Sequence, residues 1–294
     1  MTSPLENIDA VLFDCDGVVY QGDELLPGAL DTLTAIKARG IATRFVTNTS
    51  ARSVEAMHAK FVRLGLRGVV EVGECFHSGI AAAQYLVERG VRRVYVIGGS
   101  GLTVELERVG IECEGGQADN AKVMTDADFV HIASTHIPVE AVVVGYDTNL
   151  TFFKIAMATI CFQTNPNCLF IATNDDANDR LGGQWLIPGN GPAVAALTSA
   201  LHALPGVRHP DPVIVGKPNP IFGSLVLRTS NLGSLDPARV LFVGDKIETD
   251  IRLAKRCGFR SCLLLSGCAT AADAAACAPE DKPDFVLPGI SELV

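Results

Sequence analysis

Residues 13–20, FDCDGVVY, place two carboxylates, Asp14 and Asp16, two positions apart directly behind the apolar run Ile8–Phe13. The run predicts a buried strand, so both aspartates lie where the strand ends and the chain turns at Gly17. Ligands bind at the carboxyl ends of strands in open α/β sheets. Two close carboxylates repel each other unless a cation such as Mg²⁺ neutralises them. The pair offers a nucleophile beside a proton-transfer group, although Asp and Gly also favour ordinary turns.

The composition narrows the class of protein. The chain has 294 residues, of which 48% are hydrophobic, and a formal net charge of −9. We expect one large or two smaller globular domains and no nucleic-acid partner, which would call for a basic surface. The sequence has no apolar run of roughly 18 residues and no secretory signal, so we expect no membrane association. Nine cysteines without a CxxC pair favour free thiols in a reducing compartment, which predicts a cytoplasmic protein.

Strand-length apolar runs alternate with helical patterns in the first and last parts of the chain. In the first part, strands at Ala10–Phe13 and Ala42–Val46 alternate with helices at Ala29–Arg39 and Val54–Leu64. This β-α-β-α order predicts a parallel sheet with helical crossovers. The last part repeats the rhythm, with strands expected at Val213–Val215, Val240–Val243, Ser261–Leu265 and Phe285–Leu287 and helices at Ile221–Arg228 and Asp250–Cys257.

The middle of the chain is less regular and predicts an inserted second domain. We expect core segments at residues 1–78 and 207–294 around an α/β domain at residues 79–206. Residues 172–185, ATNDDANDRLGGQW, are dense in Asn, Asp and Gly and predict a loop. The other expected elements are helices at His77–Arg89, 102–109, Leu150–Ile160 and Pro192–Leu204 and strands at Arg93–Ile97, Ala141–Val144 and Leu169–Ala172.

Two further polar clusters follow predicted strands and can bind phosphate. VTNTSARS at residues 46–53 supplies Thr47 and Asn48, a hydroxyl and a carboxamide that can donate to phosphate oxygens. GKPNP at residues 216–220 supplies Lys217, a compact charge that can neutralise a phosphoryl group. Taken singly, the first cluster also fits a polar turn and the second a surface lysine.

A last cluster, VGDKIETDI at residues 243–251, adds two acids. Asp245 follows a predicted strand and can complete a metal site, and Asp250 can orient Lys217 or a metal-bound water. A helix N-cap is the ordinary alternative for Asp250. Together, the acids, the lysine and the neutral donors suit Mg²⁺-assisted phosphoryl transfer, which depends on positioning and charge stabilisation.

The order of these motifs resembles that of the haloacid dehalogenase (HAD) superfamily: DxDG(T/V), a strand-end Thr or Ser, a Lys, and GDxxxTD. The closer match is the large-cap branch, which includes 4-nitrophenyl phosphatase, phosphoglycolate phosphatase, pyridoxal phosphatase and NagD-type enzymes. The resemblance implies a Rossmann-like parallel-sheet core with an inserted α/β cap domain. It also implies Mg²⁺-dependent hydrolysis of small phosphomonoesters, such as 4-nitrophenyl phosphate and 2-phosphoglycolate, through an aspartyl-phosphate. The matching segments are residues 10–20, 43–53, 143–147, 169–176, 188–197, 214–222 and 240–251.

The resemblance also implies a role for each motif residue. Asp14 resembles the nucleophile, and Asp16 resembles the acid/base that protonates the leaving group and then activates water. The remaining roles are ligation of Mg²⁺ by the Asp14 carboxylate, the Asp16 backbone carbonyl and Asp245, and phosphoryl binding by Thr47, Asn48 and Lys217. Thr49 departs from the branch, which usually has a second Asn there, but its hydroxyl or backbone N–H can still donate.

Arg180 is the one basic residue of segment 172–185 and lies among Asp175, Asp176 and Asp179. It is either solvated or paired with these acids, or it binds a substrate carboxylate and so favours 2-phosphoglycolate. The resemblance further suggests a homodimer formed through the cap. The alternatives are a phosphatase of pyridoxal phosphate, nucleotides or sugar phosphates, a phosphomutase, a dehalogenase, and an inactive binding protein. A dehalogenase needs neither the proton shuttle of Asp16 nor the metal ligand Asp245.

Overall fold

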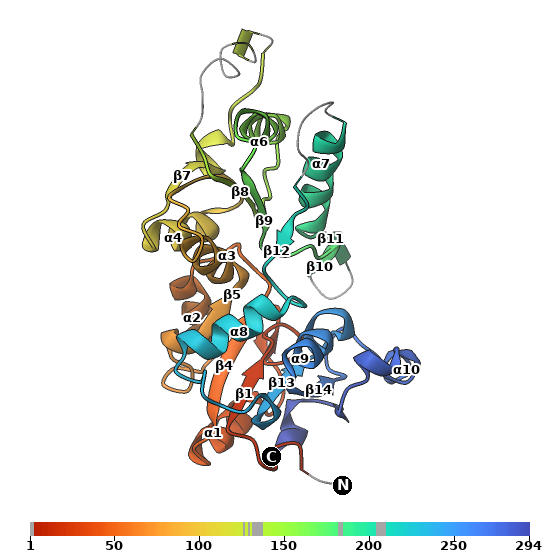
Figure 1. Cartoon of the computed structure of the whole chain (residues 1–294). Coiled ribbons are helices and arrows are strands. Elements are labelled where there is room, and N and C mark those ends of the chain that lie inside the picture. Colours follow the sequence, from red (N-terminus) through yellow and green to blue (C-terminus); the bar gives the residue numbers. More distant parts are fainter. Residues whose placement is uncertain (1–2, 126, 129, 131–137, 182–184, 204–209) are drawn as a thin grey trace. The chain divides into compact units, whose positions relative to one another are not determined.

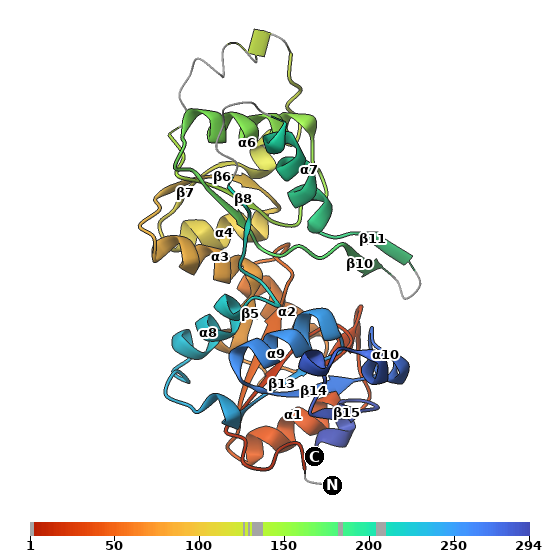
Figure 2. The same ribbon diagram turned by 45° about the vertical axis from the view of Figure 1, so that its right-hand side comes forward.

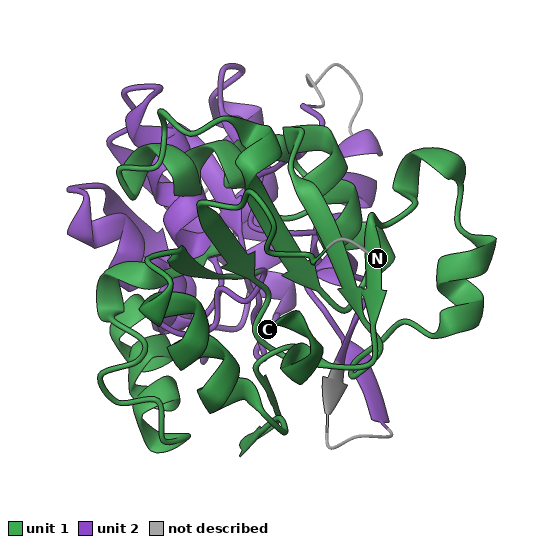
Figure 3. Cartoon of the chain, turned by 90° about the horizontal axis from the view of Figure 1, so that it is seen from below, with its two compact units in different colours: residues 1–47, 54–77, 217–294 green, residues 48–53, 78–216 purple. Residues whose placement is uncertain are grey.

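The computed structural model describes residues 3–125, 127–128, 130, 138–181, 185–203 and 210–294 (Figure 1). The chain forms two units, which are coloured separately in Figure 3. The first unit comprises Met1–Thr47, Val54–His77 and Lys217–Val294, and the second comprises Asn48–Ser53 and Ser78–Gly216.

The first unit is built on a parallel six-stranded sheet with the order β15-β14-β13-β1-β4-β5. Its two central strands β1 and β13 are buried along their whole length, which explains their continuous apolar sequences. The strands are β1 (Ala10–Phe13), β4 (Ala42–Thr47), β5 (Cys75–His77), β13 (Val240–Gly244), β14 (Arg260–Leu264) and β15 (Phe285–Leu287).

Helices complete the first unit. The ring of Phe61 on α2 lies 4.9 Å from that of Phe45 on β4, so this helix contributes an aromatic side chain to the core. Helix α8 begins where the side chain of Asn219 accepts the N–H of Ile221, with Pro220 as its first residue. The elements are α1 (Ala29–Ala38), α2 (Val54–Arg63), α8 (Pro220–Thr229), α9 (Arg252–Cys257) and α10 (Ala271–Ala276), with a hairpin of β2 (Tyr20–Gln21) and β3 (Glu24–Leu25).

The second unit has its own parallel sheet, with the strand order β12-β9-β8-β6-β7. Helices α6 and α7 lie on one side of this sheet and α3 and α4 on the other (Figure 2). Its elements are β6 (Arg93–Ile97), β7 (Glu112–Gly115), β8 (Ala141–Val144), β9 (Leu169–Ala172) and β12 (Val213–Ile214), helices α3 (Ser78–Val87), α4 (Ser100–Arg108), α6 (Phe152–Thr164) and α7 (Gly191–His202), and a hairpin of β10 (Asn178–Leu181) and β11 (Trp185–Pro188).

The structure corrects three expectations about single elements. The strand before Lys217, β12, pairs with β9 of the second unit, so it is not part of the six-stranded sheet. Segment 172–185 is not wholly a loop, because β10 and the start of β11 form an antiparallel hairpin. The helix expected at Asp250–Cys257 begins as α9 at Arg252, after a π-helical turn at Ile247–Ile251. Within the described residues, no helix is long and apolar enough to cross a bilayer.

Candidate active site

The turn after β1 directs its first aspartate into the protein. The N–H of Asp14 donates to the Val243 carbonyl of β13 at 2.8 Å, which extends the sheet ladder and buries the Asp14 side chain. Asp16 is exposed, and its backbone bridges to Tyr20 of β2. Between them, Cys15 is fully buried, and burial raises the pKa of its thiol, so this thiol is a packing group rather than a nucleophile. The turn therefore presents one carboxylate inward and one outward.

Lys217 connects this turn to the acids after β13. Its Nζ donates to Asp14 Oδ1 at 2.6 Å, lies 2.8 Å from Asp250 Oδ1 and donates to the Val46 carbonyl at 3.3 Å. The side chain is only 4% exposed. Burial by itself would lower the pKa of Lys217, but the charges of Asp14 and Asp250 outweigh burial and raise it. The ammonium is therefore a fixed positive charge beside the Asp14 carboxylate.

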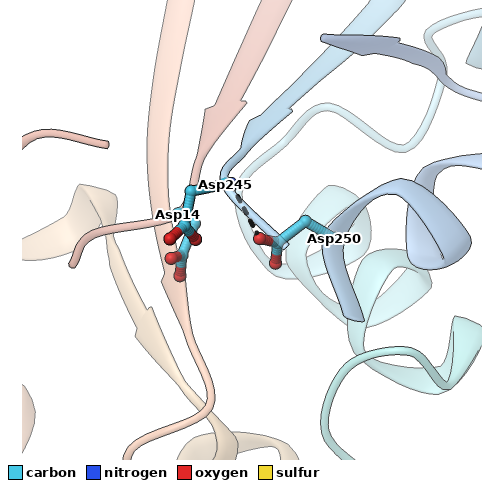
Figure 4. Close-up of side chains that lie close together, drawn as sticks. All are labelled: Asp14, Asp245 and Asp250. Carbon is cyan, nitrogen blue, oxygen red and sulfur yellow. Dashed lines mark hydrogen bonds between the residues drawn. The ribbon is translucent and has the colours of Figure 1, made fainter. Parts of the chain in front are cut away.

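Asp250 is held by the main chain as well as by the lysine. Its Oδ2 accepts the backbone N–H groups of Asp245 and Lys246, each at 3.1 Å, and the first of these bonds is the dashed line in Figure 4. It lies in the π-helical turn that precedes α9, a feature often found at functional sites. A Cβ on Gly244 would lie 2.2 Å from the Asp250 Cβ, so this packing requires glycine. Asp250 is thus placed to orient Lys217.

Asp245 follows β13 and is 4% exposed. Its Oδ2 accepts the backbone N–H of Cys268 at 2.7 Å. Burial raises the pKa of Asp245 to about 6, helped by the charge of Asp250 and opposed by hydrogen bonds from Cys268. Figure 4 shows the carboxylates of Asp14 and Asp245 next to each other, and one oxygen from each of Asp14, Asp245 and Asp250 lies within 4.8 Å of the others.

These residues fit a hard divalent cation. Three carboxylates share the site with one ammonium, so these four buried groups carry a formal net charge of −2. Burial also raises the pKa of Asp14, and the charges of Asp250 and Asp245 raise it further against the opposing effect of Lys217. A cation with two charges and a preference for oxygen ligands would balance this group.

The other predicted substrate-binding residues lie at and directly after the end of β4 and on β10. Thr47 is the last residue of β4 and pairs with His77 of β5. Thr49 belongs to the second unit and is exposed, and its Oγ1 accepts the Ala51 N–H at 3.4 Å. Arg180 lies on β10 of the second unit, where its backbone pairs with Leu186.

Asn48 is also part of the second unit, where its polar groups have protein partners. Its Nδ2 donates to Asp176 Oδ2 at 2.8 Å. Its carbonyl accepts from Ser78 Oγ at 2.5 Å and from Asn174 Nδ2 at 2.8 Å. The sequence patterns did not predict these partners, which lie 30 and more positions away.

The sequence patterns also missed a contact segment after β14. Ser266 Oγ donates to the Gly17 carbonyl at 2.7 Å, and the Ala269 N–H donates to the Asp245 carbonyl at 2.9 Å. A signal was present, since this Ser-Gly turn follows a predicted strand of the same parallel sheet and therefore reaches the same edge. Serine and glycine are so common in turns that their identity alone did not mark them.

The fold and the site define a class: an α/β enzyme with a Rossmann-like parallel sheet and an acidic centre at the carboxyl ends of its strands. Residues 11–112 match the family model of haloacid dehalogenase-like hydrolases, and residues 214–293 match a second, HAD-hydrolase-like model. Phosphoglycolate phosphatase 2 of Arabidopsis thaliana is 34% identical over 298 residues, which cover 99% of this chain and 94% of that protein.

Solved structures agree with these matches. The 4-nitrophenylphosphatase of Thermotoga maritima aligns with a TM-score of 0.81 and 27% identity over 99% of this chain and 98% of its own. The magnesium complex of a glycerol phosphate phosphatase from Mycobacterium tuberculosis aligns with a TM-score of 0.79 and 27% identity, over 100% of this chain and 78% of its own. The chain belongs to the haloacid dehalogenase superfamily, among its NagD- and 4-nitrophenylphosphatase-like phosphatases. The expected family, fold class and enzyme class are confirmed.

Proposed function

We propose that this protein is a Mg²⁺-dependent phosphatase of small phosphomonoesters in which Asp14 is the nucleophile. The observation that carries the proposal is the group formed by Asp14, Lys217 and Asp250 beside Asp245, all within the first unit. A lysine fixed 2.6 Å from the attacking carboxylate can neutralise the phosphoryl group as it is transferred.

The proposed reaction has two steps. An oxygen of Asp14 attacks phosphorus, and the leaving alkoxide takes a proton from Asp16. Asp16, now a carboxylate, removes a proton from a water molecule, which attacks the phosphoryl group on Asp14 and releases inorganic phosphate. Lys217 stays protonated throughout, oriented by Asp250.

The residues proposed to hold Mg²⁺ are Asp14 and Asp245 through their carboxylates and Asp16 through its backbone carbonyl. When bound there, the ion would neutralise negative charge on the phosphoryl oxygens. The buried excess of acidic groups supports this proposal, as does the magnesium complex of the M. tuberculosis relative.

Finer features of the function are proposed on the family resemblance. We propose that the second unit is the cap, that Thr47, Asn48 and Thr49 bind the phosphoryl group, and that Arg180 selects a substrate carboxylate, as in 2-phosphoglycolate. We also propose a homodimer through the cap, which is supported by the exposure of Trp185 (72%) and Leu186 (66%) on β11. The free cysteines support a reducing, cytoplasmic location.

The test of the proposed function is turnover of 4-nitrophenyl phosphate with Mg²⁺ and with EDTA. Asp14→Asn is expected to lose turnover by several orders of magnitude, because an amide neither attacks phosphorus nor binds Mg²⁺ well. The matched control is Asp23→Asn, which removes an exposed carboxylate from the β2–β3 turn. Retention of more than a few per cent of turnover by Asp14→Asn, or equal losses in both variants, would contradict the mechanism.

A further inference from the structure

The loop Ser266–Ala269, which joins β14 to α10, contacts both acidic segments of the site. At one end, Ser266 Oγ donates to the carbonyl of Gly17, in the turn that carries Asp14 and Asp16. At the other end, the Cys268 N–H donates to Asp245 Oδ2 at 2.7 Å, and the Ala269 N–H donates to the Asp245 backbone carbonyl at 2.9 Å. The loop thus links two segments that are more than 200 positions apart in sequence.

The Asp245 carboxylate is packed between two glycines. A Cβ on Gly267 would lie 1.9 Å from Asp245 Oδ2, and a Cβ on Gly17 would lie 2.4 Å from the same oxygen. Gly17 also has a φ of +80°, which favours glycine for a second reason. Gly267 does not have a positive φ, so only the neighbouring Asp245 side chain demands glycine there. The Asp245 carboxylate is therefore confined both by Gly267 of the loop and by Gly17 of the turn after β1.

We propose that the loop Ser266–Ala269 positions Asp245 as a cation ligand. In this role the Cys268 N–H holds Oδ2, so that Asp245 presents Oδ1 to the cation, while Ser266 fixes the Asp14–Gly17 turn at the same site. Hydrogen-bond partners of metal ligands commonly govern affinity in this way. The inference rests on the proposed metal-dependent function and assigns to this loop a role beyond it.

The test is the Mg²⁺ affinity of the metal-stripped protein, measured by isothermal titration calorimetry. Gly267→Ala is expected to weaken Mg²⁺ binding by about ten- to a hundredfold, the usual effect of disturbing a ligand's support. The matched control is Gly289→Ala, because Gly289 has extended backbone and open space around its Cα, and it is expected to keep wild-type affinity. Excess Mg²⁺ should restore kcat of Gly267→Ala on 4-nitrophenyl phosphate.

If circular dichroism shows that Gly267→Ala does not fold, a second pair of variants tests the proposal. Ser266→Ala removes one hydrogen bond and is expected to weaken Mg²⁺ binding by about two- to tenfold. Ser266→Thr keeps the hydroxyl and is expected to restore the affinity. Wild-type affinity in folded Gly267→Ala, or in Ser266→Ala, would overturn the role of the loop. Failure of the proposed function would look different, since the wild-type chain itself would then bind no Mg²⁺.

Discussion

Lys217 and the three aspartates around it show how burial sets the chemistry of single residues. The attraction of the Lys217 ammonium to two adjacent carboxylates outweighs the free-energy cost of removing it from water, so the pKa of Lys217 rises. The carboxylates share a single positive charge among them, and burial raises the pKa of both Asp14 and Asp245. Without a cation, the buried negative charge of this group lowers the stability of the folded protein. A bound cation would balance that charge and raise the stability.

The first prediction separates metal binding from proton transfer. Asp245→Asn is expected to weaken Mg²⁺ binding and to regain part of its turnover in excess Mg²⁺. Asp16→Asn is expected to stay impaired at any Mg²⁺ concentration, because it lacks acid/base chemistry worth about 10²–10⁴-fold. The measurement is kcat for 4-nitrophenyl phosphate across a Mg²⁺ titration of both variants. Equal rescue of the two would show that the roles are assigned wrongly.

The second prediction concerns stability without metal. The pKa of Asp245 rises from 3.8 to about 6 on folding, so between these values the folded chain holds a proton that the unfolded chain has lost. Stability from this group is therefore present at low pH and is lost as the pH rises through 6. In EDTA, Asp245→Asn is expected to melt at a higher temperature than wild type at pH 7.5, with a smaller difference at pH 4.5.

The control for this stability prediction is the same comparison in saturating Mg²⁺. There the wild type is expected to gain stability by mass action, and Asp245→Asn much less. Thermal melts followed by circular dichroism give all of these values. A difference between the two proteins that does not grow with pH in EDTA would show that Asp245 is not destabilised by its surroundings.

At the scale of elements, the sequence predicted strands best where both faces are buried. Ala10–Phe13 and Val240–Gly244 are continuous apolar runs, and their lengths and the order of the surrounding elements were enough to place Asp14 and Asp245 at one sheet edge. Lys217 was predicted at the same site because it follows a predicted strand, but that strand pairs with β9 in the sheet of the second unit. An apolar pair such as Val213–Ile214 carries no information about its partner strand.

Other elements escaped prediction because their stability comes from contacts distant in sequence. The hairpin β10–β11 begins in the polar residues Asn178–Leu181, which on their own favour a loop. In the π-helical turn at Ile247–Ile251, the Asp250 carboxylate accepts two backbone N–H groups, and no periodicity in the sequence reveals these contacts. The loop Ser266–Ala269 was missed for the same reason, since it meets its partners Gly17 and Asp245 only in the folded structure.

Helix α6 provides a prediction at this scale. Its Lys154 is fully buried and donates to Asp147 Oδ2 at 2.7 Å and to Asn120 Oδ1 at 2.6 Å. The Asp147 side chain is only 4% exposed, so Lys154→Met would leave a buried charge unpaired and is expected to cost about 3–5 kcal/mol. Arg92→Met, at an exposed cationic residue of the same unit, is expected to change the free energy of unfolding by no more than about 0.5 kcal/mol.

Urea unfolding followed by circular dichroism measures both costs. Adding Asp147→Asn to Lys154→Met is expected to recover part of the loss, because the stranded charge is then removed. If Lys154→Met costs no more than Arg92→Met, the ion pair does not stabilise the packing of α6 against the preceding loop.

At the scale of the whole molecule, the two units carry different parts of the predicted chemistry. Asp14, Lys217, Asp245 and Asp250 all lie in the first unit, whereas Arg180 lies in the second. The chain's net charge of −9 would disfavour a substrate with an extra carboxylate, so selection of such a substrate calls for a local positive charge. We therefore expect metal binding and substrate choice to respond to different substitutions.

Arg180→Ala tests this division. If Arg180 binds a substrate carboxylate, the lost charge-assisted pair, worth about 1.5–3 kcal/mol, lowers kcat/KM for 2-phosphoglycolate by roughly ten- to a hundredfold. Turnover of 4-nitrophenyl phosphate, which has no carboxylate, should hardly change, and Mg²⁺ affinity by calorimetry should equal that of the wild type because every proposed metal ligand is in the first unit. Arg228→Ala, at a helix end in the first unit, serves as the charge-matched control. An equal loss on both substrates, or none on either, would mean that Arg180 is only a solvated or acid-paired residue.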